Sequence, residues 1–393
     1  METKPKKISF SNTEVAFAHY SNRSLKKAYG VYQFIGNSVL TNIGTTLTKI
    51  ALFMHFPIRP FVKPIIFNQF CGGENLKECM PTINLLEQRN VHVNLNYSVE
   101  IKHSEKDFEK TLCKTKGAIE FASRKKAISI ICCKVTSLGY ADILEKRQFR
   151  KELSEKELQA YNKMVERLEE ICDYALKYDV GIFWDAEESW IQNEIDMLVD
   201  GFMAKYNKEK ALIFNTYQLY RADKLEDLET ALAQAKKGGY ILGAKLVRGA
   251  YIEKENQWAE ENDEVSLIHQ TKKAVDKDYN LAVKLCIENL SNVGVCIASH
   301  NEQSNLYATE LMLKHNIQPS HPNLTFSQLY GMGDFITFNL AEQGYNANKY
   351  LPYGPVKEVI PYLIRRAQEN SSIDGQMSRE LSMLKKELIR RSI

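Results

Sequence analysis

Short apolar runs rich in β-branched residues recur along the chain, and polar stretches with turn residues separate them. Runs of this kind predict β-strands. Eight of them occur, at residues 91–97, 127–137, 181–186, 211–217, 240–249, 293–300, 324–330 and 349–354. They are apolar enough to be buried on both faces, which is typical of a parallel sheet covered by helices on both sides.

The stretches between these runs have helical periodicity. In residues 224–235, for example, Leu225, Leu228 and Leu232 share one helix face. Strand and helix alternating eight times predict an α/β protein with its parallel sheet closed as a (β/α)8 barrel of the TIM type. An open doubly wound sheet is the alternative. The count of eight favours the barrel, as does the lack of a complete GxGxxG motif, since Gly331-Met332-Gly333 has no third glycine.

The same pattern suggests three parts. Residues 1–90 are expected to form an N-terminal helical arm, residues 91–372 the barrel, and residues 373–393 a C-terminal amphipathic helix with a leucine stripe beside basic residues. Within the barrel, the highly charged segment 140–175 is expected to be a helical insertion projecting into solvent. A basic amphipathic helix most often packs on its own protein, and less often on a partner or an anionic membrane.

Composition narrows the class of protein. Lys plus Arg number 52 against 49 for Asp plus Glu, so the net charge of +3 carries no nucleic-acid signature. The eight cysteines show no even spacing and no CxxC pair, which indicates buried thiols in a reducing compartment. No apolar run that could act as a secretory signal follows residues 1–7. The apolar stretch 50–58 falls short of the about 20 residues that a membrane span needs. We therefore expect a cytoplasmic protein in which this stretch is an interfacial or subunit-contact segment.

Polar residues stand at the carboxyl ends of the predicted strands, where a barrel of this type builds its active site. They are Asn96, Lys134, Asp185, Asn215, Lys245, Arg248, His300, Asn301, Gln328 and Tyr350. The set is rich in basic and amide groups, so the site is expected to favour anionic ligands. Lys134 and Lys245 each interrupt an apolar run, where an unpaired ammonium is costly. An ion pair with Asp185 is the structural alternative for either lysine.

Arg365 and Arg366 follow the last predicted strand, in a helix-like stretch that ends at Glu369. Two adjacent guanidinium groups can grip one small anion from two directions. Glu369 lies three and four residues further on, so it can reach either arginine on the same helix face. An exposed surface face is the alternative, but the position directly after a strand end favours an anion site.

Other chemistries have little support. No Cys/His/Asp set has metal-ligand spacing, His300-Asn301 is too isolated to indicate zinc, and no Ser/His/Asp arrangement is legible. A lysine is the one obvious nucleophile. A redox cofactor with its own phosphates fits the cationic groups better.

Six segments in order now carry a family resemblance, each at a strand end or in the helix that follows. They are residues 133–136, 184–188, 244–251, 298–301, 326–332 and 350–369. Between Gly72 and Asn370 the chain resembles the monofunctional FAD-dependent proline dehydrogenases. The resemblance implies oxidation of L-proline to 1-pyrroline-5-carboxylate, the first step of proline catabolism, with hydride passing from C5 to N5 of FAD. It also implies a membrane quinone as electron acceptor and a separate pyrroline-5-carboxylate dehydrogenase downstream.

The resemblance further implies roles for single residues. Arg365, Arg366 and Lys134 would hold the proline carboxylate, Glu369 would orient the arginines, and Glu100 would pair with Arg365 as a gate. The substrate ring would be lined by Tyr350, Leu329, Tyr251 and Asp185. Asp185 would also lie beside FAD, together with Asn215, Lys245, Val247, Arg248, Gly249, Ala250, Ser299, His300 and Asn301. The chain departs from the family in two places: some members exchange Lys and Arg at residues 245 and 248, and many have Asp where Asn96 stands.

Three other functions compete with this one. A hydroxyproline dehydrogenase is expected to have a smaller residue than Tyr350. A Schiff-base lyase would use Lys245 or Lys134 with a lowered pKa. A barrel without catalysis would act as an amino-acid-binding scaffold. The sequence does not fix the oligomeric state, and the apolar arm or the basic C-terminal helix would supply any peripheral contact with the inner face of a membrane.

Overall fold

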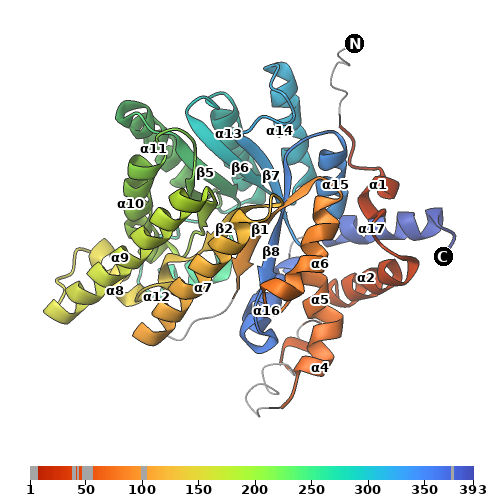
Figure 1. Cartoon of the computed structure of the whole chain (residues 1–393), viewed down its shortest axis with the longest axis horizontal. Coiled ribbons are helices and arrows are strands. Elements are labelled where there is room, and N and C mark those ends of the chain that lie inside the picture. The colour runs from red at the N-terminus through yellow and green to blue at the C-terminus, as the bar shows by residue number, and fades with distance from the viewer. Residues whose placement is uncertain (1–7, 38–40, 42–43, 47–55, 99–103, 373–375) are drawn as a thin grey trace. The chain divides into compact units, whose positions relative to one another are not determined.

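The protein forms a closed barrel of eight strands that follow one another in chain order, which confirms the predicted (β/α)8 fold (Figure 1). The computed structural model describes residues 8–37, 41, 44–46, 56–98, 104–372 and 376–393, and of residues 366–372 and 376–378 the backbone alone. The strands are β1 (Val91–Tyr97), β2 (Ile128–Cys133), β3 (Gly181–Trp184), β4 (Ile213–Gln218), β5 (Leu242–Val247), β6 (Val293–Ala298), β7 (Leu324–Leu329) and β8 (Ala347–Tyr353). The first and last strands pair in parallel, with Val91 opposite Ala347 and Tyr97 opposite Tyr353.

Helices lie outside the strands. Before β1 come α1 (Thr13–Phe17), α2 (Asn22–Ile35), α4 (Arg59–Val62), a π-helical turn η1 (Lys63–Phe67), α5 (Asn68–Phe70) and α6 (Leu76–Glu87). From β1 to β5 the helices are α7 (Glu105–Ser123), a 3-10 turn η2 (Val135–Ser137), α8 (Ala141–Gln148), α9 (Glu155–Tyr178), α10 (Ser189–Tyr206) and α11 (Lys224–Gly238). The remaining helices are α12 (Ile252–Glu261), α13 (Lys272–Ile287), α14 (Glu302–Lys314), α15 (Asp334–Glu342), α16 (Val356–Ser372) and α17 (Gln376–Arg390).

The chain forms two compact units. The first comprises residues 1–100, 300–305 and 327–393, and the second comprises residues 101–299 and 306–326. The first unit therefore contains the N-terminal helices, β1, β8 and the C-terminal helices. The second contains β2 to β6 with their helices. The predicted division into arm, barrel and C-terminal helix, at residues 90 and 372, stays a prediction.

The charged connection between β2 and β3 is packed, contrary to our expectation for residues 140–175. Its helix α9 begins with a capping box between Ser154 and Glu157 and ends at Asp179, which adopts the left-handed conformation with φ 56°. The face that carries Met164, Leu168 and other apolar side chains is buried, and α9 contacts α7, α10 and β3. The charged residues occupy the opposite face of an amphipathic helix, so the segment is not a solvated excursion.

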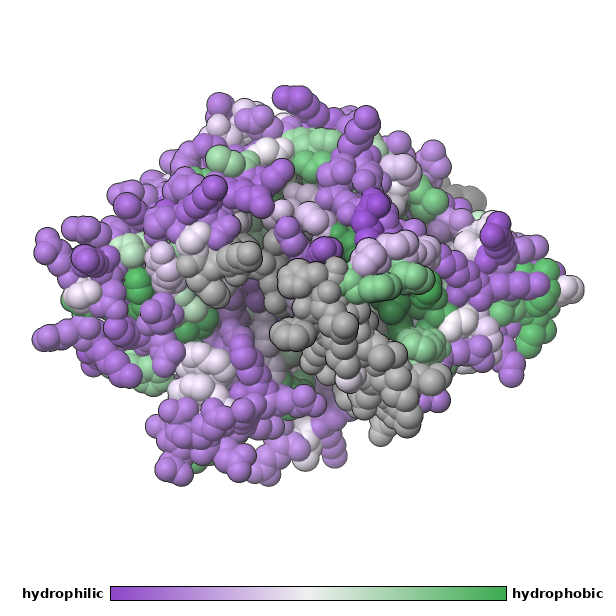
Figure 2. Space-filling model, turned by 90° about the horizontal axis from the view of Figure 1, so that it is seen from below, coloured by the Kyte–Doolittle hydropathy of each residue, from purple (hydrophilic) through white to green (hydrophobic). Residues whose placement is uncertain are grey.

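The face of the molecule that Figure 2 shows is largely hydrophilic, with separate, smaller hydrophobic patches. In the part of the chain that the structure describes, no helix combines the length and the apolar character that crossing a membrane requires. All the cysteines except Cys113 are buried.

Candidate active site

Lys134 is the first residue after β2, and its ammonium lies among polar partners of the second unit. Its Nζ lies 2.9 Å from the hydroxyl of Tyr251, to which it donates a hydrogen bond, and 3.6 Å from Oε2 of Glu187. Burial lowers the pKa of Lys134, but the nearby Tyr251, Glu187 and Glu188 outweigh that effect, so the net pKa is raised. The ammonium is therefore charged throughout the physiological pH range and suits an anionic ligand.

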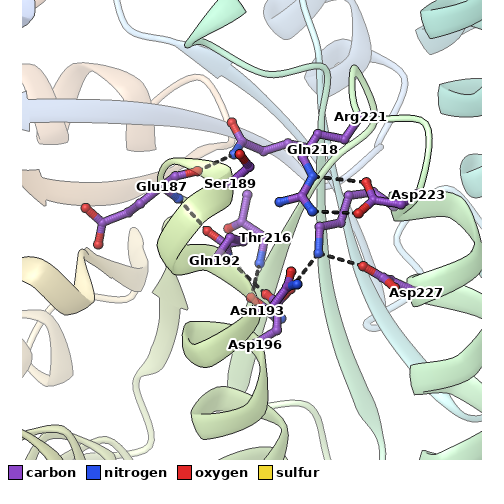
Figure 3. Close-up of polar contacts among 12 residues, drawn as sticks. Glu187, Ser189, Gln192, Asn193, Asp196, Thr216, Gln218, Arg221, Asp223 and Asp227 are labelled. Atoms are coloured by element: carbon purple, nitrogen blue, oxygen red, sulfur yellow. Dashed lines mark hydrogen bonds and ion pairs between the residues drawn. The ribbon is translucent and has the colours of Figure 1, made fainter. Parts of the chain in front are cut away.

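Glu187 is a site residue that our sequence reasoning missed. Its side chain is only 3 % exposed, and its carboxylate accepts hydrogen bonds from the backbone N–H of Thr136 at 3.0 Å and from the Thr136 hydroxyl at 2.5 Å. Its own backbone is held by Gln192 and Gln218, and Figure 3 shows the carboxylate directed away from that network. The available signal was the acidic pair Glu187-Glu188 close behind Asp185 at the end of β3.

Lys245 and Asp185 form a buried ion pair, with Nζ and Oδ1 2.5 Å apart. Lys245 lies in β5 and Asp185 directly follows β3. Burial lowers the pKa of Lys245, but the Asp185 carboxylate more than offsets this, and the pKa is raised. The predicted ion pair with Asp185 is thus made by Lys245, whereas Lys134 has Glu187 as its acidic neighbour. A raised pKa in both lysines is the opposite of what a Schiff-base nucleophile requires.

Arg248 lies just beyond β5 and is fixed by groups from neighbouring elements. Its guanidinium donates to Asp276 of α13 at 2.9 Å through Nε and to the hydroxyl of Ser299 at 2.7 Å through Nη1. Its guanidinium carbon also lies 4.3 Å from the centre of the Tyr279 ring. These contacts hold the planar guanidinium in one orientation beside Ser299, at the end of β6.

The loop after β5 lies close to the Tyr220 ring at Gly249. This glycine has φ 134°, and a Cβ at this position would lie 2.4 Å from the Tyr220 ring. A side chain therefore does not fit here. Val247, at the end of β5, is partly exposed, and Ala250 is exposed.

Asn215 is nearly inaccessible and belongs to a polar network with residues of α10 and α11. Its amide donates to Asp196 at 2.9 Å, and Asp196 also accepts from Lys224 at 2.6 Å. Lys224 in turn pairs with Asp227 at 2.6 Å. The known contacts of Asn215 are thus structural, and its predicted contact with a cofactor stays a prediction.

Three of the predicted residues lie together in the first unit: one after β6, one at the end of β7 and one in β8. The backbone N–H of Leu329 donates to Nε2 of His300 at 3.2 Å. The N–H of the next residue, Tyr330, donates to the carbonyl of Tyr350 at 2.9 Å. Asn301 uses its side-chain oxygen to accept from the N–H of Ser304 at 3.0 Å, in the first turn of α14. His300, Leu329 and Tyr350 therefore form one local arrangement.

The arginine pair lies on α16, and Arg365 is partly exposed. The side chains of Arg366 and Glu369, and the whole of Glu100, lie outside the described residues. The carboxylate clamp, its orientation by Glu369 and the Glu100 gate stay predictions. Asn96, which stands where the family often has Asp, hydrogen-bonds through its amide to Ser98.

The donor set at the ends of β5 and β6 suits a phosphate-bearing cofactor. Lys245 and Arg248 supply two cations, and Ser299 supplies a hydroxyl. Gly249 keeps the loop free of a side chain where the backbone passes Tyr220. Charge-assisted donors of this kind bind phosphate and stabilise anionic groups. The residues present therefore fit the FAD that the resemblance implies.

Comparison with known proteins decides the family. The family model "Proline dehydrogenase" matches residues 79–379. The chain belongs to the proline dehydrogenase family. "Proline dehydrogenase 1, mitochondrial" of Dictyostelium discoideum is 32% identical over 382 residues and 85% of this chain. "Hydroxyproline dehydrogenase" of Xenopus laevis is 28% identical over 84% of this chain and 78% of its own length.

Among solved structures, proline utilization A from Bdellovibrio bacteriovorus, inactivated by N-propargylglycine, superposes with a TM-score of 0.73. It is 20% identical and the match covers 93% of this chain and 38% of that one, so this likeness concerns the fold alone. The chain spans 66% of the length of the Dictyostelium relative.

Proposed function

We propose that this protein oxidises L-proline to 1-pyrroline-5-carboxylate with FAD as its cofactor. The observation that carries the proposal is the proline dehydrogenase family match over residues 79–379. FAD supplies the two-electron acceptor, whose N5 takes the hydride from proline C5. The protein's task is then to bind the substrate carboxylate, to hold C5 in a reactive position and to keep charged groups near the cofactor.

Carboxylate binding is assigned to Lys134, Arg365 and Arg366. The raised pKa of Lys134 supports this role, because a permanently charged ammonium attracts a carboxylate. Glu187 holds the segment that follows Lys134 through its two hydrogen bonds to Thr136. Glu369 is proposed to orient the arginines and Glu100 to pair with Arg365 as a gate.

Cofactor binding is assigned to residues within β4, at the ends of β3, β5 and β6, and in the segments that follow those ends. The proposed set is Asp185, Asn215, Lys245, Val247, Arg248, Gly249, Ala250, Ser299, His300 and Asn301. Within this set, the assignment of Arg248 is supported by its guanidinium, which Asp276 holds in place. The assignment of Lys245 is supported by its ion pair with Asp185, 2.5 Å away, which orients the ammonium. Some family members have Arg at the position of Lys245 and Lys at the position of Arg248. In this chain the ammonium of Lys245 comes from within β5, and the guanidinium of Arg248 comes from just after that strand.

Ring recognition is assigned to Leu329, Tyr350, Tyr251 and Asp185. A second candidate substrate, hydroxyproline, is favoured by the similarity to the Xenopus hydroxyproline dehydrogenase. Tyr350 favours proline, since its bulk disfavours an added ring hydroxyl. Comparing kcat/KM for L-proline and for hydroxyproline, in the wild type and in Tyr350→Ser, tests this choice. A wild-type preference for hydroxyproline would overturn it.

The clamp is tested with Arg366→Met, assayed for L-proline oxidation with an artificial electron acceptor. Loss of a bidentate charged contact is expected to raise the KM for proline by about a hundredfold, with FAD still bound. Arg124→Met is the matched control, because Arg124 is an exposed arginine at the end of α7. An Arg366→Met enzyme with the KM of the wild type would refute the assignment.

A membrane quinone is the proposed electron acceptor, with the protein in the cytoplasm and in contact with the inner face of the membrane. The product would pass to a separate pyrroline-5-carboxylate dehydrogenase. The contact is assigned to Phe56, Phe61 and Ile65, which are 53%, 61% and 51% exposed, beside the basic residues Arg59 and Lys63. Of the predicted interfacial stretch 50–58, residues 56–58 are described. Exposed apolar side chains suit the surface of a bilayer, and the two cations beside them also pair with Glu74.

This contact is tested by sedimentation with anionic vesicles and by quinone reduction in their presence. Phe61→Ser is expected to weaken vesicle binding and to lower proline-dependent reduction of a vesicle-borne quinone, while activity with a water-soluble acceptor is unchanged. Leu176→Ser is the control, because Leu176 is 57% exposed on α9. Equal vesicle binding by wild type and Phe61→Ser would contradict the proposed contact.

A further inference from the structure

The turn between β7 and α15, residues 329–334, is held by buried polar groups from segments distant in the sequence. Two of its glycines have positive φ, 77° at Gly331 and 63° at Gly333. A Cβ on Gly331 would lie 2.0 Å from the carbonyl oxygen of Gln69, so the backbone approaches the N-terminal helices too closely for a side chain. We call this segment the β7–α15 turn.

Lys349 of β8, Tyr20 between α1 and α2, and Tyr32 of α2 bind one side of the β7–α15 turn. Lys349 is 1% exposed and pairs with Asp334 at 2.7 Å, and it also donates to the carbonyls of Met332 and Leu329. Tyr20 donates to Asp334 at 3.1 Å, and Tyr32 donates to the carbonyl of Gly331. A buried charge is retained where it has partners of this kind, because leaving it unpaired is costly.

The C-terminal helix α17 binds the same turn through Glu380. This side chain is 3% exposed, and its carboxylate accepts a hydrogen bond from the backbone N–H of Gly333. The preceding residue, Arg379, forms a two-point ion pair with Glu302, at 2.9 and 3.1 Å. Glu302 is the first residue of α14, directly after His300 and Asn301. Two consecutive residues of α17 thus bind the segments that follow β6 and β7.

The β7–α15 turn carries groups assigned above to the substrate and cofactor. Leu329 is its first residue and donates its N–H to His300. Gly333 also lies against His300, since a Cβ there would be 2.9 Å from the Nδ1 atom of the ring. A shift of Gly333 therefore reaches His300 directly and Leu329 through the turn.

We infer that Glu380 is a positioning residue, which acts through the Gly333 N–H to hold Leu329 and His300 in place for substrate binding. The inference rests on the proposed function. It gives α17 a role in the active site, in addition to its packing against the rest of the first unit. Without the carboxylate, the buried N–H of Gly333 lacks its acceptor, and the turn must move to find another partner.

The test measures KM and kcat for L-proline, FAD content and thermal stability in Glu380→Ala, Glu380→Gln and a matched control. The control is Glu387→Ala, two helical turns further along α17. Glu387 is equally buried, but it binds Arg390 of its own helix and Arg391, the residue after that helix. Its loss weakens the docking of α17 and leaves the hydrogen bond between Glu380 and Gly333 in place. Glu380→Asp serves in place of Glu380→Ala if that variant does not fold.

Glu380→Ala is expected to raise the KM for L-proline about tenfold while kcat changes less than threefold. Glu380→Gln keeps an oxygen acceptor and is expected to stay within about threefold of the wild-type KM. Glu387→Ala is expected to lose stability but to keep its KM. An unchanged KM in Glu380→Ala or Glu380→Asp, or an equal rise in Glu387→Ala, would overturn the inference alone. A wild type that does not oxidise proline would overturn the proposed function and this inference with it.

Discussion

The pairing of Lys245 with Asp185 places two opposite charges in the barrel, with side chains that are 9% and 14% exposed. Removing one partner takes away the ion pair that offsets the desolvation of the other charge, whereas removing both can be almost neutral. We therefore expect Lys245→Met to lower the free energy of unfolding by about 3–5 kcal/mol. The double variant Lys245→Met/Asp185→Asn is expected to recover most of that loss.

Urea unfolding of the cofactor-free proteins measures these free energies, with Lys236→Met as the control. Lys236 is an exposed lysine whose partner is the neutral Asn289. Additive losses in the double variant would show that the two charges are not coupled.

Glu187, for which the sequence predicted no role, supports Lys134, which is assigned to carboxylate binding. Its carboxylate is the acidic neighbour of Lys134 and binds Thr136 through two hydrogen bonds. We expect Glu187→Gln to raise the KM for L-proline about fivefold, which corresponds to ~1 kcal/mol, with a smaller effect on kcat.

Glu188→Gln is the comparison for that measurement, since Glu188 also raises the pKa of Lys134 but forms its ion pair with Lys254 of α12. Steady-state kinetics at saturating acceptor provide both constants. If Glu187→Gln and Glu188→Gln have the same KM, Glu187 has no specific role in substrate binding.

At the scale of elements, the stability that Glu380 of α17 contributes depends on pH. Burial, with a further contribution from Asp334, raises the pKa of Glu380 to about 7. The other titratable groups near it are Lys349, Arg379 and Tyr32. The folded protein then holds a proton that the unfolded chain releases near its ordinary pKa of 4.5. The Glu380 contribution to stability is thus fully present below pH 4.5 and is lost as the pH rises to about 7.

We expect this loss, roughly 3 kcal/mol, to be absent in Glu380→Gln. The measurement is the difference in unfolding free energy between wild type and Glu380→Gln across that pH range. A difference is needed because burial lowers the pKa of His19 to about 4, which gives the opposite slope between pH 4 and pH 6.5. A difference curve that is flat between pH 4.5 and pH 7 would contradict the raised pKa of Glu380.

The elements were predictable where one local signal dominates. All eight strands lie within a few residues of the predicted runs, because buried parallel strands leave a continuous apolar pattern. The α9 segment was misjudged because dense surface charge concealed a regular apolar stripe with Met164 and Leu168 on it. The stripe itself was legible at a period of 3.6 residues.

Side-chain partners were less predictable. Nothing in the sequence separates Lys134 from Lys245 as the partner of Asp185, because that choice depends on how the ends of β2, β3 and β5 converge. The Glu380 contact with Gly333 joins residues 47 positions apart and has no local signal at all. Strand ends predicted which residue types meet, and tertiary packing decided which of them pair.

At the scale of the whole molecule, the eight-stranded barrel and the match to the proline dehydrogenase family agree on one architecture. Each compact unit holds its own set of assigned residues: Lys134, Lys245 and Arg248 in the second, and His300, Leu329 and Tyr350 in the first. We propose that the two lysines and the arginine supply charge for ligand binding. His300, Leu329 and Tyr350 are proposed mainly to set the shape of the site. The central claim is that bound FAD and L-proline react in this barrel.

The most direct test of that claim is anaerobic addition of L-proline to the purified holoprotein while the visible absorption of the flavin is followed. We expect a yellow protein whose flavin band bleaches on addition of L-proline and returns when a quinone analogue is added. The Arg366→Met variant should need a far higher proline concentration for the same bleaching. A flavin band that L-proline leaves unchanged at saturating concentration, in a folded wild type with FAD bound, would contradict the claim.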